Sequence, residues 1–198
     1  MGASSTSSFG ETDTTGPATP STSTGESADV RLDFIEQACE DGATYFVPGA
    51  TPNNGPLACP GLAVSDANGS VVLAPDELAA GEDALLLRPP NALQDTTSVS
   101  ASYNWVRVPE GARVMGFVSC SSEATTCDLQ ARILFDTAES VNVELLHEVD
   151  LARSSEPTEV DVPLFELEGQ LVRFILQARA NTSDDAVAAW SGLVLVVP

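Results

Sequence analysis

The stretch DLQARILFD, at residues 128–136, decides the fold class of this chain. In it Leu129, Ala131 and Ile133 alternate with polar residues, a period of two that is typical of a β-strand buried on one face only. The same alternation recurs in SVNVELLHEV (140–149), TEVDVPL (158–164) and GQLVRFILQARA (169–180). The closing stretch AAWSGLVLVVP (188–198) is apolar enough for a central strand.

Turn signals separate the strand candidates. Pro109 to Gly111 interrupts one pair of strands, and the Asn68-Gly69 pair suits a type I′ hairpin. We count about ten strand candidates at short spacing and no repeated strand–helix unit, which predicts an all-β antiparallel β-sandwich of the jelly-roll type. Leu32, Ile35 and Cys39 have helical spacing and predict one short N-terminal helix.

The composition changes at residue 30. Residues 1–29 contain 14 serines and threonines and no basic residue, which predicts a disordered Ser/Thr-rich tether before a β-sandwich domain at 30–198. The tether resembles the segment that follows the lipidated cysteine of bacterial surface lipoproteins. We therefore expect an extracytoplasmic protein, at the cell surface or in the periplasm, with a lipid anchor on a cysteine that Met1 replaces. The alternatives are a cytosolic start and N-myristoylation of Gly2.

The charge excludes several partners. The chain has 29 acidic residues against 8 basic ones, all arginine, for a net charge of −21. Such a chain repels nucleic acids and anionic lipid surfaces. No apolar stretch reaches the roughly 18 residues of a membrane-spanning helix, so we expect no transmembrane segment. The absence of lysine fits a GC-rich genome or saline surroundings.

Four cysteines, Cys39, Cys59, Cys120 and Cys127, predict disulfides and an exported protein. Three pairings are open, and the local one, Cys39 with Cys59 and Cys120 with Cys127, closes two short loops. The absence of a CxxC pair and the single histidine argue against a zinc site. Four reduced, buried cysteines in a cytosolic protein are the alternative.

Few aromatic residues are available to bind a ligand. Tyr103 and Trp105 are two residues apart, so an outward face would let both stack on a sugar ring. An inward face would place them in the core, which is favoured because Val99 and Ala101 share their spacing. Tyr45 and Phe46 lie near a Gly/Pro-rich loop and are candidates for lining a pocket or for packing in the core.

Two charged positions complete the candidate ligand sites. Arg88, before Pro89 and Pro90, either forms a structural ion pair or contacts a ligand. Asp184 and Asp185 supply oxygens of the kind that a structural calcium ion prefers, although an ordinary solvated turn also uses aspartate. We expect no other cofactor.

The sequence favours a non-catalytic protein. His147 is the single histidine, and the chain has no GxSxG, HExxH, Walker or GxGxxG motif. We interpret His147 as a strand-end residue and expect no enzymatic activity. The alternative function is a hydrolase of unrecognised type acting on an extracellular polymer, because 29 acidic residues could supply a catalytic pair.

Several segments together carry a family resemblance: DFIEQACE, a CPG loop at Cys59, GLAVSDANGSVVLA, LLLRPPNALQDTTSVSASY, VRVPEGARVMGFVSC and LFELEGQLVRFILQARANTSDDAVAAW. Over residues 32–197 the chain resembles bacterial surface jelly-roll domains related to NPCBM-type and galactose-binding-like carbohydrate-binding modules. The resemblance implies that Trp190 serves the core. The chain departs from clear sugar binders in lacking a recognisable aromatic platform. We predict an extracytoplasmic binding or structural module whose partner is a glycan or a surface protein.

Overall fold

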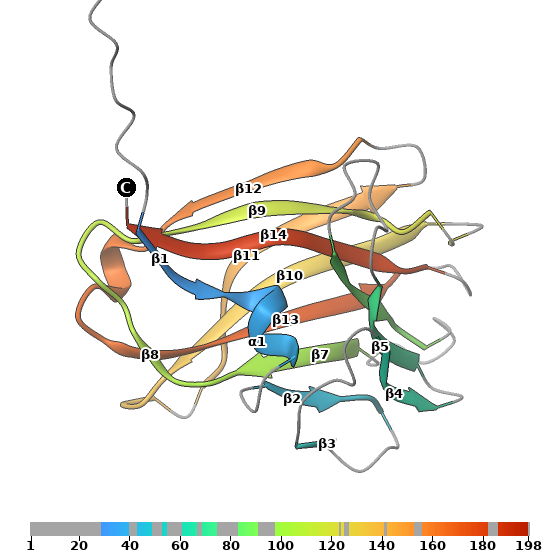
Figure 1. Cartoon of the computed structure of the whole chain (residues 1–198), viewed down its shortest axis with the longest axis horizontal. Helices are drawn as coiled ribbons and strands as arrows, with labels where there is room; N and C mark the ends of the chain where they lie inside the picture. The colour runs from blue at the N-terminus through green and yellow to red at the C-terminus, as the bar shows by residue number, and fades with distance from the viewer. Residues whose placement is uncertain are drawn as a thin grey trace, which may run out of the picture.

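The computed structural model describes residues 29–39, 43–48, 53–54, 61–66, 69–74, 83–90, 98–122, 124, 127–140, 142–152, 156–181 and 186–197. These residues form two antiparallel β-sheets that pack face to face (Figure 1). The predicted all-β sandwich is therefore confirmed. None of the helices in the described ranges is long and apolar enough to span a bilayer.

The first sheet contains the chain's closing strand at its centre. Its order is β12 (Thr158–Pro163), β9 (Arg113–Cys120), β14 (Ala188–Val197), β6 (Ala84–Arg88), β5 (Gly69–Ala74) and β4 (Gly61–Asp66). Strand β1 (Asp29–Asp33) also pairs with β14, so the first and last described strands lie side by side (Figure 1).

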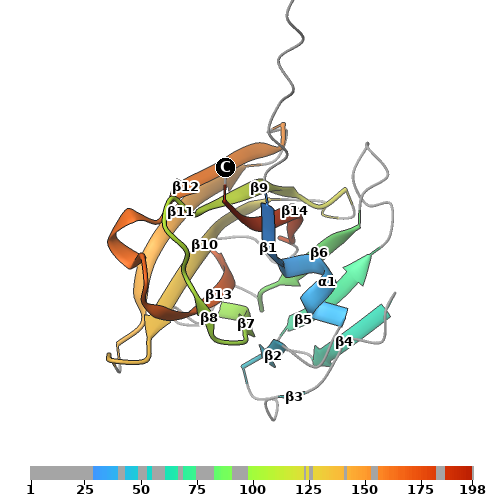
Figure 2. The ribbon, with the colours of Figure 1, turned by 60° about the vertical axis from the view of Figure 1, so that its left-hand side comes forward.

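The second sheet contains the strand that the alternation at 128–136 predicts. Its order is β11 (Glu144–Ala152), β10 (Asp128–Thr137), β13 (Leu171–Ala180), β7 (Ser98–Tyr103), β2 (Ala43–Phe46) and β3 (Asn53–Asn54). The short strand β8 (Val106–Arg107) pairs with β13 as well. A 3-10 turn, η1 (Phe165–Leu167), follows β12 and is the orange helical turn at the left of Figures 1 and 2.

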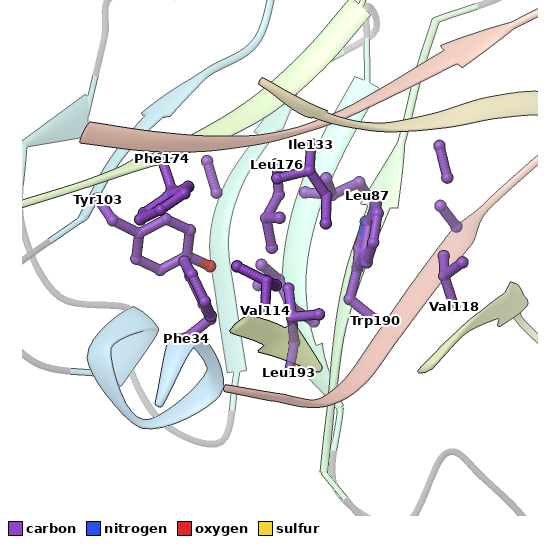
Figure 3. Close-up of a cluster of buried hydrophobic side chains, with 14 of the residues drawn as sticks. Phe34, Leu87, Tyr103, Val114, Val118, Ile133, Phe174, Leu176, Trp190 and Leu193 are labelled. Atoms are coloured by element: carbon purple, nitrogen blue, oxygen red, sulfur yellow. The ribbon is translucent and has the colours of Figure 1, made fainter. Parts of the chain in front are cut away.

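The inner faces of the two sheets enclose one main hydrophobic core (Figure 3). The alternating residues Leu129, Ala131 and Ile133 are all fully buried, as their spacing predicts. Trp190 is fully buried as well, in agreement with the core role that the family resemblance implies. Burial of a large apolar side chain contributes about 1.5–3 kcal/mol, so this core supplies the main driving force of folding.

The N-terminal helix is shorter than its apolar spacing predicts. Helix α1 spans Phe34–Cys39, whereas Leu32 belongs to strand β1 and pairs with Leu195. The helix begins after Asp33, whose carboxylate accepts hydrogen bonds from the backbone N–H groups of Ile35 and Glu36 at 2.8 and 3.0 Å. This N-cap and the pairing with β14 place the start of the helix two residues after Leu32.

The hairpin predicted at Asn68-Gly69 joins β4 to β5. Asp66 pairs with Gly69, so the two connecting residues are 67 and 68, one position earlier than the sequence pattern suggests. Gly69 has φ +136°, and a Cβ atom there would lie 2.7 Å from the Arg88 carbonyl oxygen. This close approach explains why glycine occupies the first position of β5.

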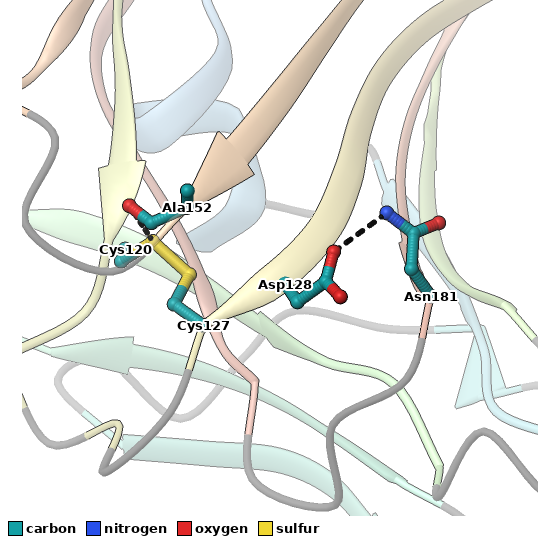
Figure 4. The surroundings of a disulfide bond; sticks show 5 residues. All are labelled: Cys120, Cys127, Asp128, Ala152 and Asn181. Atoms are coloured by element: carbon teal, nitrogen blue, oxygen red, sulfur yellow. Dashed lines mark hydrogen bonds between the residues drawn. A yellow bond between two sulfur atoms is a disulfide. The ribbon is translucent and has the colours of Figure 1, made fainter.

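One disulfide joins the two sheets. Cys120 at the end of β9 is bonded to Cys127, which directly precedes β10, with a Cα–Cα distance of 6.2 Å (Figure 4). Beside it, the Asn181 amide donates a hydrogen bond of 3.0 Å to the Asp128 carboxylate. The local pairing is confirmed for these two cysteines. The other pair of that prediction, Cys39 with Cys59, stays a prediction, because Cys59 lies outside the described ranges.

We predict that Gly116→Ala destabilises the fold more than Gly111→Ala. A Cβ on Gly116 would lie 2.6 Å from the Leu193 Cα in β14, whereas a Cβ on Gly111 meets nothing within 4 Å. Both glycines have positive φ, so both variants should lower the free energy of unfolding. We expect a loss of about 1 kcal/mol for Gly111→Ala and of at least about 2 kcal/mol for Gly116→Ala. Urea denaturation measures both losses, and equal losses would contradict the close contact between β9 and β14.

We also predict that the double variant Cys120→Ser/Cys127→Ser lowers the free energy of unfolding. The sequence separation of 7 gives a loop-closure contribution of about 2.5 kcal/mol. Urea denaturation should show a lower midpoint with the secondary structure retained by circular dichroism. A midpoint equal to that of the wild type would mean that the bond does not constrain the unfolded chain.

Candidate functional site

The outer side of the second sheet carries polar side chains in two adjacent rows, and the next row joins Ser102 to the apolar residues Ile175 and Leu134. In β10, β13 and β7 every second residue is buried in the core, so the residues between them point away from it. We call the following set the polar face: Gln130, Arg132, Gln177, Arg179, Ser98, Ser100 and Ser102. All seven are partly exposed.

The strand register arranges the polar face in rows that cross the sheet. Arg132 lies opposite Gln177, and Gln177 lies opposite Ser100. The same row ends at Phe46, which lies opposite Ser100 on β2. Neighbouring strands are about 4.8 Å apart, so each row presents hydrogen-bonding groups at a regular short spacing.

Carboxylates hold two arginines of this side of the sheet in place. Arg132 donates through Nε to the Glu148 carboxylate at 2.6 Å and through Nη2 to the Gln130 side-chain oxygen at 2.7 Å. Arg173 donates two hydrogen bonds to the Asp136 carboxylate, one from Nε and one from Nη2. The bond from Nε is 3.0 Å long. A planar guanidinium that is held in this way is preorganised to present its remaining N–H groups.

Two exposed aromatic rings flank the polar face. Trp105 is 44% exposed, and the Arg173 guanidinium carbon lies 5.1 Å from its ring centroid. Phe46 is 47% exposed at the end of the central row. Since Asp136 holds Arg173, the cation–π contact restrains the orientation of the Trp105 ring.

The structure separates the two aromatic residues that the sequence pattern paired. Tyr103 is 2% exposed and Trp105 is 44% exposed, so they do not form a surface pair. The reason is that β7 ends at Tyr103, and the period of two does not continue to Trp105. The core placement that Val99 and Ala101 favour is therefore correct for Tyr103 alone.

Tyr45 is also a core residue. It is fully buried, and its hydroxyl donates a hydrogen bond of 2.7 Å to the backbone carbonyl of Ala38. Burial raises the pKa of Tyr45 and of Tyr103, because the phenolate would lose its hydration. Phe34 packs edge-on against Tyr103, with 4.9 Å between ring centroids.

The remaining candidates lie elsewhere. Arg88 ends β6 in the first sheet, opposite Ser70, and so does not join the polar face. His147 is half-buried on β11, opposite Ile133. Asp184 and Asp185 fall outside the described ranges, within which no cluster of His, Cys, Asp or Glu is suited to a metal ion.

Sequence reasoning missed most of the polar face. Gln130, Arg132, Gln177 and Arg179 appear in the sequence as the polar positions of two alternating strands. Their alternation predicts exposure, but it does not predict which strands are neighbours. The missing information is the pairing of β10 with β13 and of β13 with β7.

Comparison with known proteins supports the fold through solved structures of low sequence identity. No known family matches the sequence, and no curated protein does so either. A solved carbohydrate-binding module, described as having promiscuous specificity within the β-sandwich superfamily, is 14% identical with a TM-score of 0.51. The alignment covers 87% of this chain and 63% of that one, so it spans less than two thirds of the solved chain. The chain has the fold of a carbohydrate-binding module.

Two further solved structures are similar at lower scores. A family 61 carbohydrate-binding module in complex with β-1,4-galactotriose is 15% identical, with a TM-score of 0.47 over 72% of this chain and 97% of that one. The xylanase 10B modules of Clostridium thermocellum, complexed with xylohexaose, are 12% identical, with a TM-score of 0.47 over 86% and 28%.

The two buried tyrosines give a matched test of the core. We predict that Tyr45→Phe lowers the free energy of unfolding by about 1 kcal/mol, because it removes the hydrogen bond to Ala38. Tyr103→Phe should leave stability unchanged or raise it, since the Tyr103 hydroxyl is buried and has no hydrogen-bond partner among the described residues. Urea denaturation compares the two variants, and a larger loss for Tyr103→Phe would contradict these environments.

Proposed function

We propose that the chain is a non-catalytic glycan-binding module and that the polar face with Trp105 and Phe46 is its binding surface. The observation that carries the proposal is the exposed Trp105 ring beside the Asp136–Arg173 pair, at the margin of rows of polar side chains. A sugar ring has an apolar C–H side that stacks on an aromatic ring and hydroxyl groups that need donors and acceptors. The polar face and its flanking rings offer both.

The shape of this surface also favours a polymer. The central row of Arg132, Gln177 and Ser100 crosses the sheet toward Phe46, and Trp105 lies beside Arg173. Arg173 is four residues from Gln177 on β13, which corresponds to about 13 Å along the strand. A chain of several sugars would be needed to reach both aromatic rings. The fold shared with carbohydrate-binding modules supports the same reading.

A binding role is favoured over a hydrolytic one by the surroundings of His147. This histidine lies half-buried on β11 and makes no hydrogen bond to another described residue that would activate a nucleophile. The polar face has no histidine, and its acidic neighbours Glu148 and Asp136 are occupied by arginine. These groups therefore serve to position arginine side chains.

We further propose that the module works outside the cytoplasm. The Cys120–Cys127 disulfide supports this location, because such bonds persist in oxidising compartments. The lipid anchor, the tether at residues 1–29 and the calcium ion at Asp184 and Asp185 stay predictions from the sequence. They fall on residues outside the described ranges, apart from Asp29, which is the first residue of β1.

Affinity electrophoresis in gels that contain soluble galactan, xylan, glucan or mannan tests the proposal. We expect at least one polysaccharide to retard the full chain, with and without calcium. Trp105→Ala should weaken that binding by about tenfold or more, as expected for removal of an aromatic ring on which a sugar stacks. Gln177→Ala should weaken it by about fivefold, since it removes a hydrogen bond.

Phe117→Ala is the matched control. Phe117 is 43% exposed, close to the value for Trp105, but it lies on β9 in the first sheet. Its loss should leave glycan binding within about twofold of the wild type, because surface changes away from a site have small effects. Glycan binding that depends on Phe117 and not on Trp105 would move the site to the other sheet. No binding across a broad glycan array would refute the function itself.

A further inference from the structure

A second surface feature lies away from the polar face, at an open edge of the sandwich. A pocket of about 340 Å³ is lined by residues from the end of β10, the start of β11, the end of β12 and η1. Strand β11 is the outermost strand of the second sheet, and β12 is the outermost strand of the first. The outer strands β11 and β12 and the turn η1 lie on the same side of the sandwich (Figure 2), and residues from all three line the pocket.

The floor of this pocket is part of the hydrophobic core. Phe135, Leu164 and Leu167 line it, and each belongs to the main buried cluster. Apolar residues continue from the floor onto the surface. Leu145 and Phe165 line the pocket and are 55% and 65% exposed, and Val143, two residues before Leu145, is 52% exposed.

This concentration of apolar surface is unusual for the chain. The described residues include seven exposed large hydrophobic side chains, and the three most exposed are Val143, Leu145 and Phe165. Scattered single residues of this kind are ordinary on a protein surface, but a cluster around a pocket marks a binding site. Phe165 is the most exposed of the seven, and it lies at the pocket.

The rim of the pocket is acidic. Glu144 and Glu166 line it, both are exposed, and no basic residue of the described part of the chain lines it. Neither carboxylate makes an ion pair or a side-chain hydrogen bond with another described residue. This differs from the polar face, where Glu148 and Asp136 are paired with arginine. The two glutamates are therefore available to a cationic ligand.

We propose that this pocket binds a segment of a partner protein in which apolar side chains are flanked by lysine or arginine. The apolar side chains would enter the pocket between Leu145 and Phe165, and the cationic groups would meet Glu144 and Glu166. The net charge of −21 would also accelerate the approach of a basic segment.

Charge argues against the two occupants that the chain itself could supply. Residues 1–29 contain four acidic residues and no basic one, so this segment is repelled by the rim. A second copy of the chain would bring together two surfaces that each carry Glu144 and Glu166, in molecules of net charge −21. Like charges at a contact are unfavourable, which leaves a basic segment of another protein.

Calorimetric titration of the full chain with three blocked peptides tests the proposal. The peptides are KKLFLKK, its acidic counterpart EELFLEE and its polar counterpart KKSSSKK. We expect saturable binding of the first peptide alone, weaker at high salt. KKSSSKK controls for general attraction to an acidic protein, and equal binding of this peptide would overturn the proposal.

Two variants test whether KKLFLKK binds at the pocket. Phe165→Ser should weaken binding of KKLFLKK by about tenfold, and Glu144→Gln/Glu166→Gln by about fivefold. The matched controls are Phe117→Ser on β9 and Glu156→Gln/Glu159→Gln near the start of β12, which should stay within about twofold. All four sets change exposed residues, so the fold should persist, and circular dichroism checks this.

Three further results would overturn the proposal. The first is the absence of saturable binding of KKLFLKK at low salt. The second is binding that the control variants weaken as much as Phe165→Ser does. The third is concentration-dependent self-association in sedimentation experiments that Phe165→Ser abolishes, because the occupant would then be a second copy. The outcome is independent of glycan binding, which Trp105→Ala tests on a different face.

Discussion

The inner faces of the two sheets meet around Trp190, Phe34 and Phe174, and the positions of all surface features depend on this burial. Phe34 packs edge-on against Phe174 with ring centroids 5.7 Å apart, which links the N-terminal helix to the centre of the second sheet. Each such aromatic contact contributes about 0.5–1.5 kcal/mol beyond area burial. With Leu129 and Ile133 fixed inward, the residues between them must point outward.

The outward residues differ in how their charges are used. On the second sheet, Glu148 and Asp136 each hold an arginine, so two of the chain's eight cations are fixed beside exposed aromatic or polar groups. At the edge pocket, Glu144 and Glu166 have no such partner among the described residues. The same strongly acidic chain thus presents one surface that is locally neutralised and one that is not. These surfaces suit different partners, a neutral polymer and a basic segment.

Much of the fold could be predicted, and little of the candidate site. The alternation at 128–136 and its repeats predict the sandwich. The Cys120–Cys127 bond belongs to one of the three cysteine pairings that the sequence leaves open. The period of two places Tyr103 and Trp105 on one face, but only Trp105 is exposed, because β7 ends at Tyr103. No sequence pattern predicts the edge pocket, because Leu145 and Phe165 are 20 positions apart and lie on different elements.

The sequence by itself determined the fold class, the inward and outward residues of β10, β12 and β13, and the acidic character of the surface. These properties follow from local periodicity and composition, which need no knowledge of the partner strand. The alternation at 140–149 predicts a buried Leu145 on β11, which is wrong, because Leu145 is 55% exposed at the sheet edge. The tertiary structure alone decided that Arg132, Gln177, Ser100 and Phe46 form one row, and that Leu145 and Phe165 border one pocket. The physical reason is that strand order and register bring together residues far apart in the chain, and period two carries no information about either.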